Sequence, residues 1–170
     1  MEIKFIKGDI ALAMTDAIVN AANRNLMPGT GVCGAIFEGA GIYRLEEECR
    51  KIGYCPAGSA VITPGYKLMC KYVIHAVGPI YRGSPDDAKL LKSAYVSSLS
   101  IAKEHNLKSI AFPAISTGVY GYPLADATRI ALGVMLDFAK EKSSLEEIIC
   151  YCYDDKTYNM YLKIYDELNN

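Results

Sequence analysis

The chain has 170 residues, a hydrophobic content of 51% and a formal net charge of −1. A chain of this length can bury roughly 70% of its unfolded surface, so we expect one domain over residues 1–170. Mixed acids and bases predict no basic face for nucleic acid, and no apolar run approaches the roughly 20 residues that span a bilayer, so we predict a soluble, cytoplasmic protein without nucleic-acid or membrane partners.

The predicted elements alternate along the chain. The first segment alternates apolar and polar residues as a strand does, and it lacks the pattern of a signal peptide. Several later strands are apolar on both faces, which is typical of covered strands in a parallel or mixed sheet. We predict strands at 2–7, 17–20, 59–63, 72–77, 109–115 and 147–153, and helices at 32–51, 86–105, 123–141 and 155–168. This order predicts an α/β fold, a three-layer α/β/α sandwich around a mixed, largely parallel sheet.

The six cysteines do not form a metal-binding pattern. They stand at positions 33, 49, 55, 70, 150 and 152, and no two of them form a Cys-x-x-Cys pair. Neither of the two histidines is spaced to complete a set of metal ligands. We therefore predict reduced cysteines that pack as small hydrophobic residues, with no metal and no cofactor.

Residues 111–123, Ala-Phe-Pro-Ala-Ile-Ser-Thr-Gly-Val-Tyr-Gly-Tyr-Pro, read as a buried strand, a glycine-bearing turn and the start of a helix. Ligands of α/β sheets bind at such carboxyl ends of strands. The closely spaced backbone N–H groups of residues 116–121 and the hydroxyls of Ser116 and Thr117 suit an anion such as a diphosphate. This loop predicts phosphate binding.

Two asparagines, Asn20 and Asn23, end the predicted second strand. Each side chain can donate and accept hydrogen bonds, so the pair could tie down the following loop or contact a ligand. A second glycine-bearing loop, Leu26-Met-Pro-Gly-Thr-Gly-Val-Cys-Gly-Ala-Ile-Phe37, follows and leads into a helix. Two such loops on one sheet predict a cleft that holds an extended ligand at two points.

Five motifs occur in one order across almost the whole chain: Gly8-Asp-Ile10, Val19-Asn-Ala-Ala-Asn23, Gly29-Thr-Gly-Val32, Ile74-His-Ala-Val-Gly-Pro79 and Ile115-Ser-Thr-Gly-Val-Tyr-Gly-Tyr-Pro123. Together they resemble the macrodomain family of ADP-ribose-binding modules. They look most like its bacterial branch of O-acetyl-ADP-ribose deacetylases and mono-ADP-ribosyl hydrolases. The resemblance implies ADP-ribose or an ADP-ribosylated protein as the partner, and the sequence is compatible with a monomer.

The resemblance also implies roles for individual residues. Asp9 would accept a hydrogen bond from the adenine amino group, although an aspartate after a first strand can equally be a cap. Asn23 would bind the distal ribose, Tyr120 would cover that sugar, and Tyr153 would flank adenine, with Tyr158 as the alternative. The implied ligand-binding residues are Asp9, Ile10, Asn20, Ala22, Gly31, Val32, Gly34, Ser116, Thr117, Gly118, Val119, Tyr120 and Tyr153, with Asn23 and Cys33 as catalytic candidates.

The first glycine loop departs from the pattern of that branch. There it normally reads Gly-Gly-Gly-Val-Asp-Gly with a histidine shortly after, whereas this chain reads Gly29-Thr-Gly-Val-Cys33-Gly and then has Phe37. In that branch the aspartate is often assigned to orient or activate water. Cys33 has no carboxylate and cannot replace it in that role. A thiolate at a helix N-terminus could have a lowered pKa, but no candidate base accompanies Cys33.

Three functions follow from these observations. The first is hydrolysis of ADP-ribose conjugates, in which Asn23 fixes the ribose and a ligand phosphate acts as the base. The second is a reader that binds ADP-ribose without turnover. A dinucleotide-dependent oxidoreductase is disfavoured because no Gly-x-Gly-x-x-Gly turn follows the first strand. His75, inside an apolar strand, is expected to be structural.

Overall fold

The computed structural model, which describes residues 1–170, contains one six-stranded sheet with the strand order β1-β6-β5-β2-β4-β3. Its strands are β1 (Glu2–Lys7), β2 (Ala17–Ala21), β3 (Ala60–Pro64), β4 (Tyr72–Ala76), β5 (Ser109–Phe112) and β6 (Glu147–Cys152). All neighbouring strands pair in parallel except the edge strand β3, which runs antiparallel to β4. The predicted mixed, largely parallel sheet is confirmed.

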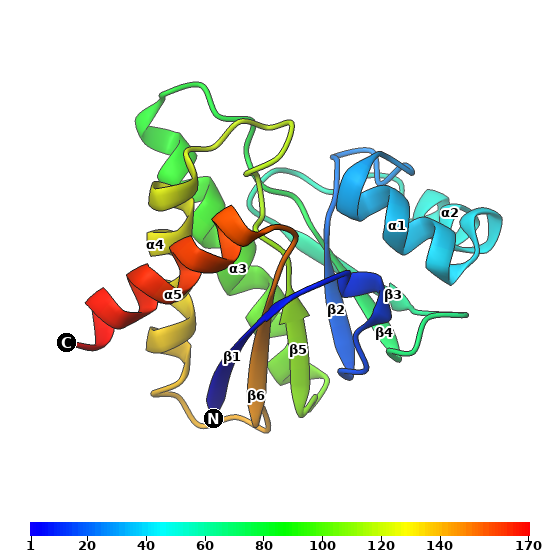
Figure 1. Cartoon of the computed structure of the whole chain (residues 1–170). Helices are drawn as coiled ribbons and strands as arrows, with labels where there is room; N and C mark the ends of the chain where they lie inside the picture. Colours follow the sequence, from blue (N-terminus) through cyan, green and yellow to red (C-terminus); the bar gives the residue numbers. More distant parts are fainter.

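Helices cover both faces of this sheet (Figure 1). They are α1 (Gly31–Ala40), α2 (Ile42–Ile52), α3 (Pro85–Glu104), α4 (Leu124–Phe138) and α5 (Asp155–Asn169), and a short 3-10 turn covers Ile10–Leu12. Helices α1 and α2 lie on one face, and α3, α4 and α5 lie on the other. The predicted three-layer arrangement is therefore confirmed.

The central strand β2 shows why the sheet needs both layers. Successive side chains of a strand point to opposite faces, and Ile18 packs with α1 and α2 whereas Val19 packs with the helices of the other face. Neither side chain is exposed. A strand with apolar side chains on both sides is stable only when both of its faces are covered.

Two predicted boundaries were wrong, each for a local backbone reason. The single helix predicted over 32–51 is two helices, because Gly41 adopts φ = 100°, a conformation that only glycine reaches easily, between α1 and α2. The strand predicted over 109–115 ends at Phe112, because Pro113 has no N–H to continue the ladder. The second correction matters for function, since it places residues 113–122 in a loop.

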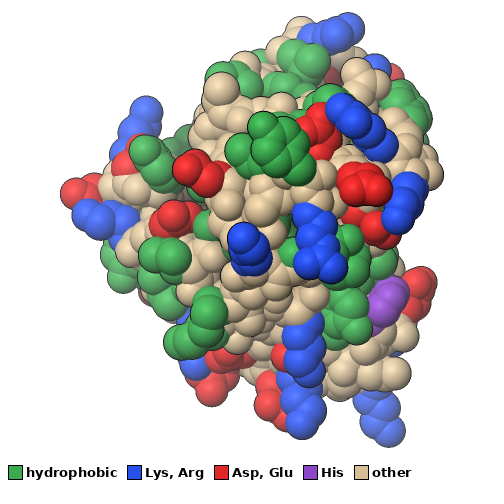
Figure 2. Space-filling model, turned by 90° about the vertical axis from the view of Figure 1, so that its right-hand side faces the viewer, with side chains coloured by type: hydrophobic (Ala, Val, Ile, Leu, Met, Phe, Trp, Pro, Cys, Tyr) green, Lys and Arg blue, Asp and Glu red, His purple; other side chains and the backbone are tan.

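The face built from α1, α2 and the edge strand β3 carries mixed charge. Lysine and arginine side chains are scattered among acidic ones there, without a continuous basic patch (Figure 2). No helix of the structure combines the length and the apolar composition that a membrane span requires.

Candidate ligand-binding site

A cavity of about 460 Å³ lies where β2, β5 and β6 end at their carboxyl termini. This volume is within the range of small-molecule sites. Its lining residues are Ala21, Ala22, Asn23, Gly29, Thr30, Gly31, Val32, Cys33, Gly78, Pro113, Ala114, Ile115, Ser116, Thr117, Gly118, Val119, Tyr120, Tyr151, Tyr153, Asp154 and Thr157. We call residues 28–34 the first loop and residues 113–122 the second loop.

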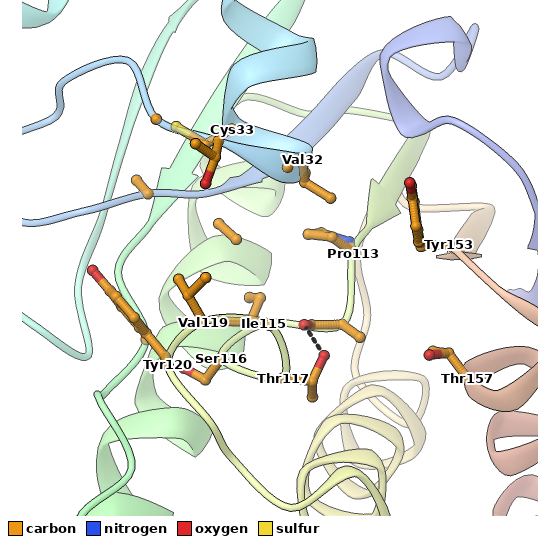
Figure 3. Close-up of a pocket in the computed structure, with 18 of the residues that line it drawn as sticks. Val32, Cys33, Pro113, Ile115, Ser116, Thr117, Val119, Tyr120, Tyr153 and Thr157 are labelled. Atoms are coloured by element: carbon orange, nitrogen blue, oxygen red, sulfur yellow. Dashed lines mark hydrogen bonds between the residues drawn. The ribbon is translucent and has the colours of Figure 1, made fainter.

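The second loop is held by its own hydrogen bonds. Ser116 has φ = 67°, its hydroxyl donates to the carbonyl of Pro79 over 2.8 Å, and its carbonyl accepts from the N–H of Tyr122 over 2.9 Å. The hydroxyl of Thr117 donates to the carbonyl of Ala114 over 2.8 Å (Figure 3). The loop therefore keeps its shape without help from a ligand.

Gly78 allows the second loop to approach β4 closely. A Cβ atom at Gly78 would lie 2.2 Å from the Ser116 hydroxyl oxygen and 2.6 Å from a methyl carbon of Ile115. Real Cβ atoms do not come so near, so this position of the chain requires glycine while Ser116 stays in place.

Each loop leaves a run of at least three consecutive N–H groups without a hydrogen-bond partner in the protein. They belong to Gly118, Val119 and Tyr120 in the second loop, and to residues 30–33, which include Gly31, Val32 and Cys33, in the first loop, where α1 begins. The first N–H groups of a helix have no partner within it, and successive free N–H groups form a concave site for anions. Val32 and Cys33 lie across the cavity from Val119 and Tyr120 (Figure 3).

The first loop is fixed by Asn23 at its approach. The Asn23 side chain donates to the carbonyl of Met27 over 2.8 Å and accepts from the N–H of Met27 over 3.0 Å. Gly34 then packs against the loop's start, because a Cβ atom there would lie 2.6 Å from the carbonyl oxygen of Gly29. Asn23 thus ties down the loop and also lines the cavity.

Cys33 forms part of the cavity wall as a neutral thiol. Its sulfur accepts from the side-chain amide of Asn20 over 3.6 Å and donates to the carbonyl of Met27 over 3.7 Å. Burial raises the pKa of the Cys33 thiol, and the hydrogen bonds from Asn20 and from the backbone of Gly29 oppose part of this rise. The thiolate that a nucleophilic role of Cys33 requires is therefore disfavoured at neutral pH.

Tyr153 and Thr157 stand at one end of the cavity, and Tyr120 stands at the other (Figure 3). Tyr153 is 82% exposed, so its ring is available to a ligand. Tyr158, the alternative partner for adenine, is absent from the lining and packs against the hydrophobic core instead.

Asp9 and Ile10 lie beside this end of the cavity, outside its lining. The N–H of Gly8 donates to the carbonyl of Cys152 over 3.0 Å, which places Asp9 next to the segment that carries Tyr153. One carboxylate oxygen of Asp9 accepts from the N–H of Ala11 over 2.9 Å, so Asp9 caps the 3-10 turn. Its other oxygen has no partner in the protein.

The structure brings most of the predicted site residues together. Those that line the cavity are Ala22, Asn23, Gly31, Val32, Cys33, Ser116, Thr117, Gly118, Val119, Tyr120 and Tyr153, whereas Asp9, Ile10, Asn20 and Gly34 do not. The sequence interpretation missed Tyr151, Asp154 and Thr157. The period of two in a strand could have found Tyr151, because residues 151 and 153 share a face.

All six cysteines are free and buried, and no group of three or more His, Cys, Asp or Glu residues is arranged to hold a metal ion. The polar character of the cavity comes from backbone N–H groups, hydroxyls and amides, with Asp154 as the one carboxylate in its lining.

The family model described as "Macro domain" matches residues 19–131. This chain belongs to the macrodomain family. A macro domain-containing protein of Caldanaerobacter subterraneus is 50% identical over 173 residues, covering 99% of this chain and 98% of that protein. A protein of Citrobacter rodentium named O-acetyl-ADP-ribose deacetylase is 49% identical over 167 residues, covering 95% and 94%.

Solved macrodomain structures share this fold closely. An Oceanobacillus iheyensis macrodomain with ADP superposes with a TM-score of 0.93 at 36% identity, covering 97% of this macrodomain and 90% of that chain. A Trypanosoma brucei macrodomain in complex with ADP-ribose has a TM-score of 0.88 at 40% identity, covering 95% and 68%.

Proposed function

We propose that this macrodomain binds ADP-ribose and hydrolyses ADP-ribose conjugates, either mono-ADP-ribosylated protein side chains or O-acetyl-ADP-ribose. The observation that carries the proposal is the pair of facing N–H sets, residues 31–33 and residues 118–120. Six N–H donors around one cavity can bind the oxygens of a diphosphate without any basic side chain. The ADP and ADP-ribose complexes of related macrodomains support this ligand.

The rest of the cavity suits the two ends of such a ligand. Tyr153 offers an exposed ring for adenine at one end, and the free carboxylate oxygen of Asp9 beside it can accept from the adenine amino group. At the other end, Asn23 and Tyr120 are available to the distal ribose. A ligand with an aromatic base, a diphosphate and a second sugar would therefore contact the whole lining.

Hydrolysis in this cavity must proceed without a carboxylate in the first loop. Cys33 is a neutral thiol, and Asp154 belongs to the segment next to Tyr153, away from the distal ribose. In the proposed mechanism a water held by a ligand phosphate attacks the anomeric carbon or the acyl carbonyl, and that phosphate takes the proton. Attack at the anomeric carbon breaks its bond to the acceptor, which leaves as a carboxylate. Attack at the acyl carbonyl breaks the ester bond, and the ribose oxygen leaves as a hydroxyl with the proton from the phosphate. The protein contributes by orienting the ribose through Asn23 and by holding the diphosphate between the two loops.

The second candidate is a reader that binds ADP-ribose without turnover, and Cys33 is the observation that favours it. Both polar atoms of the Asn23 side chain also bond the backbone of Met27, so the presence of Asn23 is explained by its structural role even if the protein catalyses nothing. The two candidates share the ligand and differ only in turnover.

A single-turnover assay separates them. We would incubate the protein with a substrate mono-ADP-ribosylated on an acidic residue, beside Asn23→Ala, Cys33→Asp and, as a matched control, the exposed loop variant Asn25→Ala. We expect release by the wild type and by Asn25→Ala, with a loss of roughly tenfold or more in Asn23→Ala that exceeds its loss of ADP-ribose affinity. No release by the wild type, together with tight ADP-ribose binding and activity gained by Cys33→Asp, would establish a reader instead.

A further inference from the structure

A buried chain of hydrogen bonds runs beneath the first loop from the edge of the sheet to the cavity. Thr63 of β3 bonds His75 of β4 over 2.9 Å, His75 bonds Asn20 of β2 over 3.1 Å, and Asn20 bonds Cys33 of α1 over 3.6 Å. Thr63, His75 and Asn20 are at most 2% exposed, and only Cys33 reaches the cavity. The chain therefore connects an edge strand to the ligand site through three strands and a helix.

The partners fix the direction of each bond. The Thr63 hydroxyl donates to the carbonyl of Pro64 over 3.2 Å, so it accepts from the Nε2–H of His75. Burial lowers the pKa of His75 to about 4, so the ring is neutral and carries one proton. Its Nδ1 is then an acceptor, and the side-chain amide of Asn20 donates to it.

Asn20 has one orientation that satisfies this arrangement. One hydrogen of its Nδ2 bonds His75 Nδ1 and the other bonds the Cys33 sulfur, whose own proton points to the carbonyl of Met27. The Oδ1 atom of Asn20 is buried with no hydrogen-bond partner. Because that oxygen contributes nothing to hold the amide, the two Nδ2 bonds carry its position.

We infer that His75 is a positioning residue for the ligand site: it holds Asn20, and Asn20 holds the Cys33 thiol at the first turn of α1. The position of Cys33 also affects the free N–H groups of residues 31–33, because Cys33 belongs to the same first turn of α1. The effect on ADP-ribose rests on the proposed function, whereas the tautomer of His75 and the reactivity of Cys33 do not.

The imidazole tautomer is the first test, and it uses the unmodified protein. Nitrogen-15 NMR of the histidine rings at pH 7 should show His75 protonated at Nε2 and unprotonated at Nδ1. The exposed His105 serves as the reference ring in the same spectrum. A proton on Nδ1 of His75 would overturn the inference, because Asn20 could then not donate to that atom.

Variants test the connection to Cys33. His75→Leu removes the acceptor at similar size, and His75→Asn keeps it, since an asparagine oxygen can occupy the place of Nδ1. Alkylation of Cys33 by iodoacetamide, followed by peptide mass spectrometry, should be roughly tenfold slower in His75→Leu, because an Asn20 that no longer donates to the sulfur leaves the pKa of the thiol higher. His75→Asn should restore the rate to within roughly threefold of the wild type.

Two further variants keep the test decisive if His75→Leu does not fold. Thr63→Val removes the acceptor of Nε2–H and should slow Cys33 alkylation severalfold. Cys55→Ala is the matched control, because it removes a buried thiol of the same core layer whose sulfur bonds only the carbonyl of Pro56, and it should leave the rate unchanged. Equal Cys33 rates in the wild type and Thr63→Val, or no rescue by His75→Asn, would overturn the inference.

ADP-ribose provides the last measurement. By calorimetry, we expect affinity to fall roughly tenfold in His75→Leu and to recover in His75→Asn. A wild type that binds no ADP-ribose would refute the proposed function, while the tautomer and the alkylation rates would still decide the role of His75.

Discussion

The two loops that face each other across the cavity reach their shapes by different means. The second loop is closed by internal bonds, among them those of Ser116 and Thr117, and by the N–H of Tyr81, which donates to the carbonyl of Tyr120 over 2.8 Å. In the first loop, none of the N–H groups of residues 30–33 has a partner. The N–H of Gly34 donates to the carbonyl of Thr30 over 3.4 Å, and the side chain of Thr30 makes no capping bond.

The difference shows where each loop's order originates. A loop with its own hydrogen bonds presents its N–H groups in one arrangement before a ligand arrives, which limits the entropy lost on binding. The first loop is held by hydrogen bonds to residues beneath it. Asn23 bonds Met27, and Asn20 bonds Cys33. We therefore expect a substitution that breaks the internal bonds of the second loop to disrupt that whole loop. We expect the first loop to change when residues beneath it, outside the cavity, are substituted.

Gly78→Ala should have the largest effect, because it breaks the pre-formed loop. The new methyl group would lie 2.2 Å from the Ser116 hydroxyl oxygen, which must leave its bond with Pro79. We expect a loss of about 3 kcal/mol in the free energy of unfolding and no measurable ADP-ribose binding, checked by urea denaturation and calorimetry.

Gly133→Ala is the matched control for that change. It adds the same methyl group where no atom lies within 4 Å, inside α4. It should stabilise the protein by about 0.5–1 kcal/mol and leave binding unchanged. A Gly78→Ala variant that unfolds and binds like the wild type would show that the close approach of Gly78 and Ser116 is dispensable.

Gly118→Val should separate binding from folding. A Cβ atom at Gly118 meets nothing within 4 Å, so the side chain extends into open space at the cavity rather than into the protein. We expect the free energy of unfolding to stay within about 0.5 kcal/mol while ADP-ribose affinity falls roughly a hundredfold, because the valine occupies the space that the diphosphate needs. Unchanged affinity by calorimetry would refute the assignment of this loop to the diphosphate.

The contrast between the loops also explains what the sequence could and could not predict. The second loop is a local pattern, a strand followed by a glycine turn and a helix, so residues 111–123 were enough to predict where it lies. The support of the first loop is not local. It depends on the pairing of Asn20 opposite His75 in β2 and β4, and on Thr63 in a third strand.

The break between α1 and α2 at Gly41 could not be predicted from the sequence, because the local pattern does not show it. Apolar residues continue at helical spacing across residues 32–51, so only the backbone angle of Gly41 reveals that the helix ends and restarts. Thr157 was missed because its place at the cavity depends on how α5 packs after β6. The ligand-binding roles of Asp9 and Asn23 came from the family resemblance. From the residues alone, Asp9 could equally be a cap, and Asn23 could equally tie down the following loop.

The smallest expected effect comes from adding one methyl group to each loop, as Gly31→Ala and Gly118→Ala. Neither Cβ atom would touch another atom within 4 Å, so sterics are matched and only the backbone differs. Gly31 has φ = 59°, a backbone conformation that costs alanine about 1 kcal/mol. Gly118 has no positive φ, and replacing it with alanine lowers the conformational entropy of the unfolded chain, which favours folding. Thermal unfolding should therefore show Gly31→Ala destabilised by about 1 kcal/mol and Gly118→Ala equal to the wild type or slightly more stable. A Gly31→Ala variant as stable as Gly118→Ala would mean that the first loop rearranges around a side chain as freely as the second, and the contrast between them would not hold.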